Sequence, residues 1–98
     1  MRDTARMAEN DAHITVLTLQ DEGDALREAL LSHDLTEVRF RAREMARLAL
    51  VLGLTSVQRA ATQVIDQMGP EGSSPRWGYG AAIFALSDAL HAVERPQF

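Results

Sequence analysis

Residues 35–53 read LTEVRFRAREMARLALVLG, and this stretch decides the fold class. Its apolar residues recur at steps of four and three, which places them on one face of a helix with about 3.6 residues per turn. This inward stripe consists of Val38, Ala42, Met45, Ala49 and Leu52. Gly53 follows the stripe, and glycine readily takes the left-handed conformation that ends a helix. The stretch therefore predicts an amphipathic helix over about 36–52.

A first helix is predicted upstream, over about 12–32, by apolar residues at heptad-like spacing. These residues are Val16, Leu19, Leu26 and Leu30, with Gly23 on the same seam. The segment HITVLTL (13–19) could form a strand instead because it is rich in β-branched residues, but no second strand with a hairpin turn is available to pair with it. A short break at 33–36 follows this first helix, and Asp34 or Thr36 in it can cap the next helix.

Two further helices are predicted downstream, over about 56–68 and 77–94. Thr55 or Ser56 is the expected N-cap of the first of them, and the flexible segment GPEGSSPR (69–76) ends it. The apolar positions are Val57, Ala60, Ala61, Val64, Ile65 and Met68 in the first, and Tyr79, Ile83, Leu86, Leu90 and Val93 in the second.

Two of the three connections between these helices are very short, and short connections force neighbouring helices to run in opposite directions. We therefore predict an all-α, antiparallel up-down-up-down four-helix bundle over 12–95. Residues 1–11 are expected to be a short polar N-terminal segment, frayed or partly helical. Trp77 and Tyr79 stand at the entry of the last helix, where we expect their rings to plug the end of the bundle.

The composition agrees with one helical domain. Of the 98 residues, 46% are hydrophobic and only 5% are aromatic, and a chain of this length can bury one core. The net charge of −4 argues against binding to nucleic acid. No apolar run is long enough to cross a bilayer, so we expect a cytoplasmic protein without membrane contact.

Signatures of catalysis and of metal binding are missing from the sequence. There is no cysteine, no phosphate-binding glycine loop and no dinucleotide-binding fingerprint. His13, His33 and His91 lie on different predicted elements and lack further ligands at metal-binding spacing. We therefore expect no metal, no cofactor and no enzymatic activity.

A row of arginines on the predicted helix 36–52 is the candidate interaction site. Arg39, Arg43 and Arg47 are spaced by four and therefore lie in line along the helix. At about 100° per residue they occupy roughly 100° to 180° from Val38, opposite the inward stripe. The row is therefore expected to face solvent or a partner.

Apolar residues flank this arginine row, with Phe40 and Val51 on one side and Leu50 on the other. A solvated face would more often carry Glu and Lys throughout, so the mixture favours a protein-binding face. The simpler alternative is a charged outer face on which Glu37 and Glu44 pair with the arginines.

The segment LREALLSHDLTEVRFRAREMARLALVLGLTSVQRAATQVIDQM (26–68) resembles histidine phosphotransfer (HPt) domains, the four-helix modules that pass phosphoryl groups to response-regulator receiver domains. The matching features are LREAL at 26–30, the Asp-Leu pair at 34–35 and LGL at 52–54, which follow one another as in that family. The resemblance extends over about 17–93. It implies an HPt-like bundle.

The active motif of that family has the form A-H-x-L-K-G-S, and counting back ten residues from Gly53 to the place of its phosphorylated His reaches Arg43. The residues at the Ala, Leu, Lys and Gly positions are Ala42, Met45, Ala46 and Arg47. A guanidinium that stays protonated cannot act as the nucleophile. The resemblance therefore implies a degenerate member that cannot carry phosphate at this position.

We predict from this a non-catalytic HPt-like signalling domain that binds a response-regulator receiver domain or a histidine kinase. The predicted contact residues are Arg39, Phe40, Arg43, Arg47 and Leu50. The acidic pocket of receiver domains, which the resemblance implies as the target, would suit an arginine row with apolar flanks.

Three alternatives remain open. A homodimerising helical adaptor would cover Phe40, Leu50 and Val51 with a second copy of the chain. An active phosphotransfer protein would have to use a misaligned histidine such as His33. A DNA-binding regulator is the third, because residues 49–54 resemble the first half of a helix-turn-helix, although the second half lacks the required apolar positions.

Overall fold

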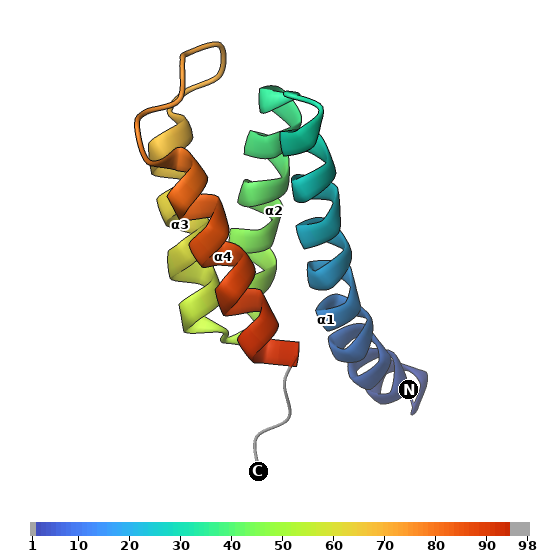
Figure 1. The fold of residues 1–98 in the computed structure, drawn as a ribbon. Coiled ribbons are helices and arrows are strands. Elements are labelled where there is room, and N and C mark those ends of the chain that lie inside the picture. The colour runs from blue at the N-terminus through green and yellow to red at the C-terminus, as the bar shows by residue number, and fades with distance from the viewer. Residues whose placement is uncertain (1, 95–98) are drawn as a thin grey trace.

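The computed structural model describes residues 2–94, with side chains described for 16–93, and it is helical apart from three connections (Figure 1). The helices are α1 (Arg2–Leu31), α2 (Leu35–Leu52), α3 (Thr55–Met68) and α4 (Tyr79–Glu94). The prediction of an all-α chain is thus confirmed for these residues. α1 begins at Arg2, whereas the predicted first helix began near residue 12, and the segment HITVLTL lies inside α1.

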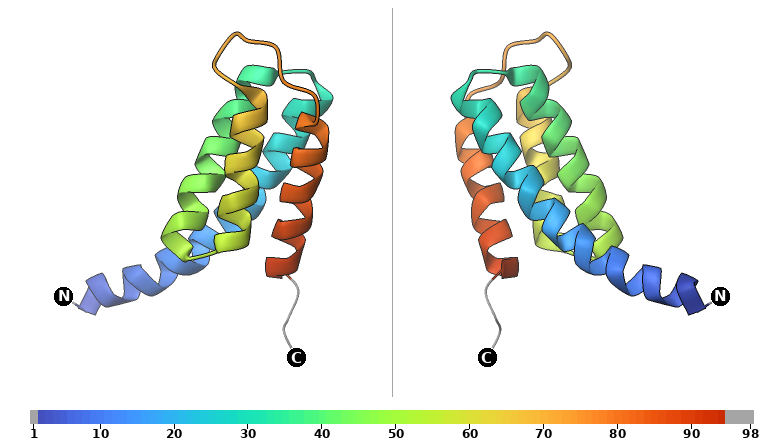
Figure 2. Two further views of the ribbon diagram at one scale, coloured as in Figure 1. Left: turned by 90° about the vertical axis from the view of Figure 1, so that its left-hand side faces the viewer. Right: turned by 90° about the vertical axis from the view of Figure 1, so that its right-hand side faces the viewer.

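Helices that follow one another in the chain lie side by side and run in opposite directions (Figures 1 and 2). α2 packs extensively against both α1 and α3, and α3 packs against α4, whereas α1 and α4 touch over only a short stretch. The short turns after α1 and α2 leave no chain length for another arrangement. Because α1 and α4 touch so little, the set of four helices is open along the seam between them.

The two ends of α2 produce these sharp turns. Asp34 is the N-cap, because its Oδ1 accepts a hydrogen bond of 3.2 Å from the main-chain N–H of Glu37. Of the two predicted caps, the structure therefore uses Asp34. Gly53 takes the left-handed conformation at φ 73° and donates its N–H to the carbonyl oxygens of Ala49 and Leu50, which confirms the predicted end of the helix.

The predicted N-cap of α3 is wrong. Leu54 occupies the N-cap position, and no side chain makes a capping hydrogen bond there. Because the left-handed turn at Gly53 is followed almost at once by the helix, Thr55 and Ser56 already belong to its first turn. A hydroxyl side chain caps from the residue before the first turn, so neither is placed to do so.

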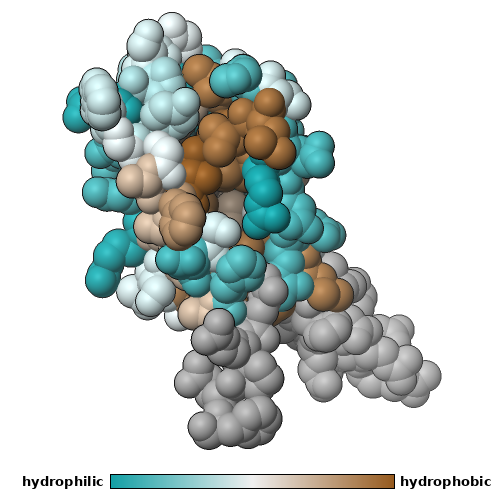
Figure 3. All heavy atoms as spheres, viewed as in Figure 1, coloured by the Kyte–Doolittle hydropathy of each residue, from teal (hydrophilic) through white to brown (hydrophobic). Residues whose placement is uncertain are grey.

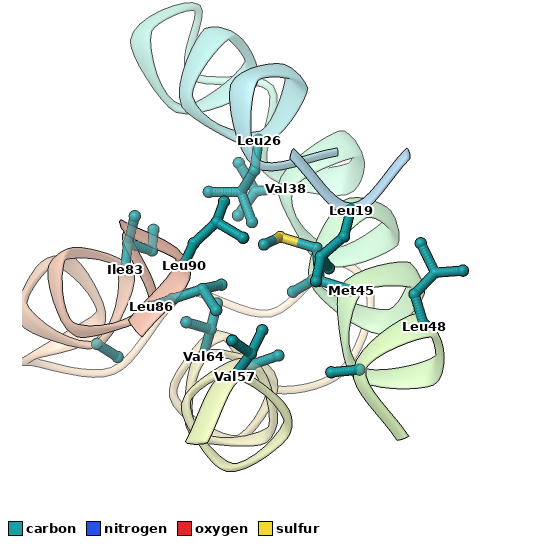
Figure 4. Packing of buried hydrophobic residues seen from close by; sticks show 14 of the residues in the cluster. Leu19, Leu26, Val38, Met45, Leu48, Val57, Val64, Ile83, Leu86 and Leu90 are labelled. Carbon is teal, nitrogen blue, oxygen red and sulfur yellow. The ribbon is translucent and has the colours of Figure 1, made fainter. Parts of the chain in front are cut away.

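One apolar core fills the space between the helices (Figure 4). Its members include Leu19 and Leu26 of α1, Val38 and Met45 of α2, Val57 and Val64 of α3, and Ile83, Leu86 and Leu90 of α4. The predicted inward stripe of α2 is buried, with Leu52 only partly so, and Leu48 is buried beside it. Since α2 has a neighbour on each side, it buries a wider face than a single stripe.

The expectation that Trp77 plugs the end of the core is wrong. Its side chain is 99% exposed, whereas Tyr79 is partly buried against the core. α4 begins only at Tyr79, and Gly78 turns the chain just before it at φ 92°. Trp77 therefore stays in the connecting loop, outside the helical register that directs Tyr79 inward.

Candidate functional site

The side of α2 that points away from the core carries arginine and apolar side chains together. We define the α2 outer face as Phe40, Arg43, Arg47, Leu50 and Val51, all of which are exposed. The exposed fractions of the two aliphatic side chains are large, 62% for Leu50 and 70% for Val51. Burial of the opposite stripe holds this face outward, so the predicted exposure of these five residues is confirmed.

The two arginines of the α2 outer face differ in how far their charge is compensated. Arg47 Nη2 donates to Glu44 Oε1 at 2.8 Å, one helical turn away, and this hydrogen bond raises the pKa of Arg47 above its usual value. Arg43 makes no ion pair or hydrogen bond within residues 16–93. The uncompensated positive charge of this face therefore lies at Arg43.

Arg39 does not belong to this face, and the expectation that it lies in an outward row with the other two arginines is wrong. Its side chain is only 3% exposed. Its Nη2 donates to the carbonyl oxygens of Met68 at 2.9 Å and Ser73 at 2.6 Å, and its Nε donates to that of Gly69 at 3.1 Å. The guanidinium thus binds the end of α3 and the loop after it.

Two physical reasons account for the burial of Arg39. It lies only about 100° around the helix from Val38, on the border of the stripe that faces α3. The last carbonyl groups of α3 have no partner within their own helix, and they carry the negative end of its dipole, so a cation that donates several hydrogen bonds is favoured there. The sequence signal for this burial was the position of Arg39 at the border of the apolar stripe. A helical wheel considers one helix alone, and it places this border residue on the outside.

Arg41 was not part of the predicted arginine row, and its ion pairs link α2 to α1. Its Nη1 donates to both carboxylate oxygens of Glu22, at 2.7 and 2.9 Å, and its Nε donates to Glu37 Oε2 at 2.7 Å. The hydrogen bond to Glu22 is the main reason why the pKa of Arg41 is raised above its usual value. Glu37 therefore pairs with Arg41, which lies outside the predicted arginine row. Glu44 pairs with Arg47, as expected under the alternative of a charged, solvated outer face.

The described histidines lie apart from the α2 outer face. His33 is exposed in the turn after α1 at φ 58°, and His91 is exposed on α4. Within residues 16–93, no group of three or more His, Asp or Glu side chains is arranged to hold a metal ion. Among the described helices, none combines the length and apolarity that a membrane span requires.

Comparisons with protein-family models, with curated proteins and with solved structures find no match. The α2 outer face must therefore be interpreted from its own chemistry. It combines one uncompensated guanidinium with an exposed aromatic ring and two exposed aliphatic side chains. Such a surface can bind a partner that is acidic and partly apolar.

Proposed function

We propose that this chain is a non-catalytic HPt-like signalling domain that binds a response-regulator receiver domain or a histidine kinase through the α2 outer face, without carrying phosphate. The observation that carries the proposal is the position of Arg43, exposed in the middle of α2 without an ion-pair partner in the described chain. This is the position at which the HPt resemblance would place the phosphorylated histidine.

The lack of phosphate transfer follows from the chemistry of the side chain at this position. Phosphoryl transfer through a histidine needs a neutral imidazole nitrogen as the nucleophile, and a guanidinium stays protonated and offers no lone pair. Arg47 stands where the family has a glycine that lets the receiver approach closely. Contact with a partner would therefore be made by the arginine side chains themselves.

The nature of the partner follows from the charge and shape of the face. Arg43 can form a bidentate pair with a carboxylate, and Phe40 and Leu50 offer apolar contacts on either side of it. Arg47 contributes less charge because Glu44 already neutralises it. Arg39 is not part of the proposed surface, since its guanidinium is buried against α3.

The test is an interaction screen with receiver domains and histidine kinases from the organism that encodes the chain. We expect retention by at least one of them and no acid-labile phosphate on the chain after incubation with phosphorylated receiver or kinase. Charge reversal in Arg43→Glu is expected to weaken binding by about tenfold or more. The matched control is Arg59→Glu, a reversal at an exposed position of α3 that should leave affinity unchanged.

Two results would contradict this proposal. Phosphate on any of the three histidines, His33 included, would show an active phosphotransfer protein. Equal affinities of Arg43→Glu and the unmodified chain would show that the α2 outer face is not the contact.

A homodimerising adaptor is the second candidate function, and the exposure of Leu50 and Val51 favours it. Adjacent aliphatic side chains this exposed are commonly covered in an assembly. Sedimentation of Leu50→Glu separates the two candidates. A dimer that dissociates in this variant supports the adaptor, whereas an unchanged state of association leaves the α2 outer face free for another protein.

A further inference from the structure

A groove runs along the open seam between α1 and α4. We define the α1–α4 groove by Leu26, Arg27 and Leu30 on its α1 wall and Ile83, Phe84 and Asp88 on its α4 wall. Figure 3 shows apolar side chains gathered on this side of the molecule, with hydrophilic ones around them. Met45 of the inward stripe forms part of the floor, so the groove and the α2 outer face lie on different sides of the molecule.

The outward face of α4 is unusually apolar for a surface helix. Its exposed side chains include Phe84, which is 69% exposed, and the alanines at 81, 85 and 92. Asp88 is the only Asp, Glu, Lys or Arg in α4 before its last residue. A helix that is apolar nearly all round is normally buried on all sides. We therefore expect the outward face of α4 to be covered by another protein surface.

Two charged side chains of opposite sign, Arg27 and Asp88, lie on opposite walls of the groove. Arg27 on the α1 wall and Asp88 on the α4 wall line the same stretch of groove as Leu30 and Phe84. Neither makes an ion pair within residues 16–93. One wall thus offers a free cation and the other a free carboxylate at a similar height along the helices.

We infer that the occupant of the α1–α4 groove is a second copy of this chain, related by a two-fold axis parallel to α4. Such an axis exchanges the two walls at constant height. It sets Arg27 of each copy opposite Asp88 of the other, and Phe84 of each copy against the α1 wall of the other near Leu30. A two-fold interface of this kind satisfies both charge pairs at once and closes on itself as a dimer.

Helix direction is consistent with this arrangement. α1 and α4 run in opposite directions within one chain (Figure 1). An axis parallel to α4 preserves the direction of α4, so α4 of the second copy runs opposite in direction to the α1 that it contacts. The contact is confined to the stretch that holds Arg27 and Phe84, because α1 runs away from α4 toward its N-terminal end (Figure 2).

The dimer leaves both α2 outer faces uncovered, because the groove floor is made by the opposite side of α2. The inference is therefore independent of the proposed function. If both hold, the assembly presents two copies of the partner-binding face.

The test is the mass of the full chain in solution by sedimentation equilibrium over a range of concentrations. We expect twice the chain mass of 10.8 kDa at the upper concentrations. Phe84→Glu should give a monomer with unchanged helix content by circular dichroism, since this side chain is already exposed in one copy. Leu50→Glu, on the α2 outer face, is the matched control and should remain dimeric.

Charge exchange provides a variant set that a folding defect cannot mimic. Arg27→Asp and Asp88→Arg each place like charges opposite one another twice in the dimer, and each should raise the dissociation constant by about tenfold. The double variant restores opposite charges and should recover most of the affinity.

A monomeric chain at every concentration would overturn the inference. A dimer that Leu50→Glu dissociates and Phe84→Glu does not would overturn it as well, as would a double variant weaker than both single variants. Unchanged receiver binding in Arg43→Glu would contradict only the proposed function, so the failures of the two proposals are distinguishable.

Discussion

A Cβ atom at Gly23 of α1 would lie 2.5 Å from Cδ2 of Leu90 of α4, so any side chain at this position would require the Leu90 side chain to shift. The same atom would lie 3.6 Å from Cε of Met45, in ordinary contact. A cavity of about 40 Å³ lined by Gly23, Leu26 and Leu90 adjoins this point. The lack of a side chain at Gly23 therefore leaves room for the Leu90 side chain between α1 and α4.

Gly23→Val is expected to destabilise the chain by about 1–3 kcal/mol, because the small adjoining cavity gives Leu90 room for only part of the displacement. Asp24→Val is the matched control, since it introduces the same β-branched side chain at the next, exposed position of α1. Urea unfolding followed by circular dichroism gives both free energies. Equal losses in the two variants would mean that the close contact at Gly23 contributes nothing.

Arg39→Ala is expected to lower the free energy of unfolding by about 2–4 kcal/mol, because it removes a buried cation and leaves the carbonyl oxygens of Met68 and Ser73 without this donor. Arg43→Ala, on the same helix but exposed, should change it by less than about 0.5 kcal/mol. Chemical denaturation of the two variants side by side is the measurement. Similar stabilities would contradict the buried position of Arg39.

Asp34→Ala is expected to lower the free energy of unfolding by about 0.5–2 kcal/mol, because the N–H of Glu37 loses the carboxylate that caps α2. Thr36→Ala should be close to neutral, since Thr36 is exposed and lies inside the first turn. Thermal unfolding of both variants distinguishes the two residues that the sequence offered as caps. A larger loss in Thr36→Ala would reverse the assignment.

The fluorescence of Trp77, the single tryptophan, is expected to report a water-exposed ring in the native protein, because this side chain is 99% exposed. Iodide should quench it almost as well before unfolding as after, and Trp77→Ala should alter stability by less than about 0.5 kcal/mol. A blue-shifted native emission with protection from iodide would show that this residue is covered in solution.

Much of the secondary structure could be predicted because it depends on neighbours within one helical turn. The buried stripe of α2, the cap at Asp34 and the stop at Gly53 all follow from residues three or four positions apart. The same locality explains why Phe40, Arg43, Arg47 and Leu50 were placed outward correctly.

What sequence reasoning missed depends on segments far apart in the chain. Arg39 lies on the border of its helical stripe, and only the approach of the end of α3 turns it inward. Arg41 is bound by Glu22 of another helix, and Trp77 is left outside because α4 starts two residues later.

The sequence by itself determined that the chain forms amphipathic helices and which side of each helix is apolar, since both are properties of local spacing. Only the tertiary structure decided which border residues are buried, which arginine keeps a free charge, and that α1 and α4 leave an apolar groove between them. The physical reason is that solvation, ion pairing and packing depend on neighbours brought together from distant parts of the chain, and a periodic pattern contains no record of them.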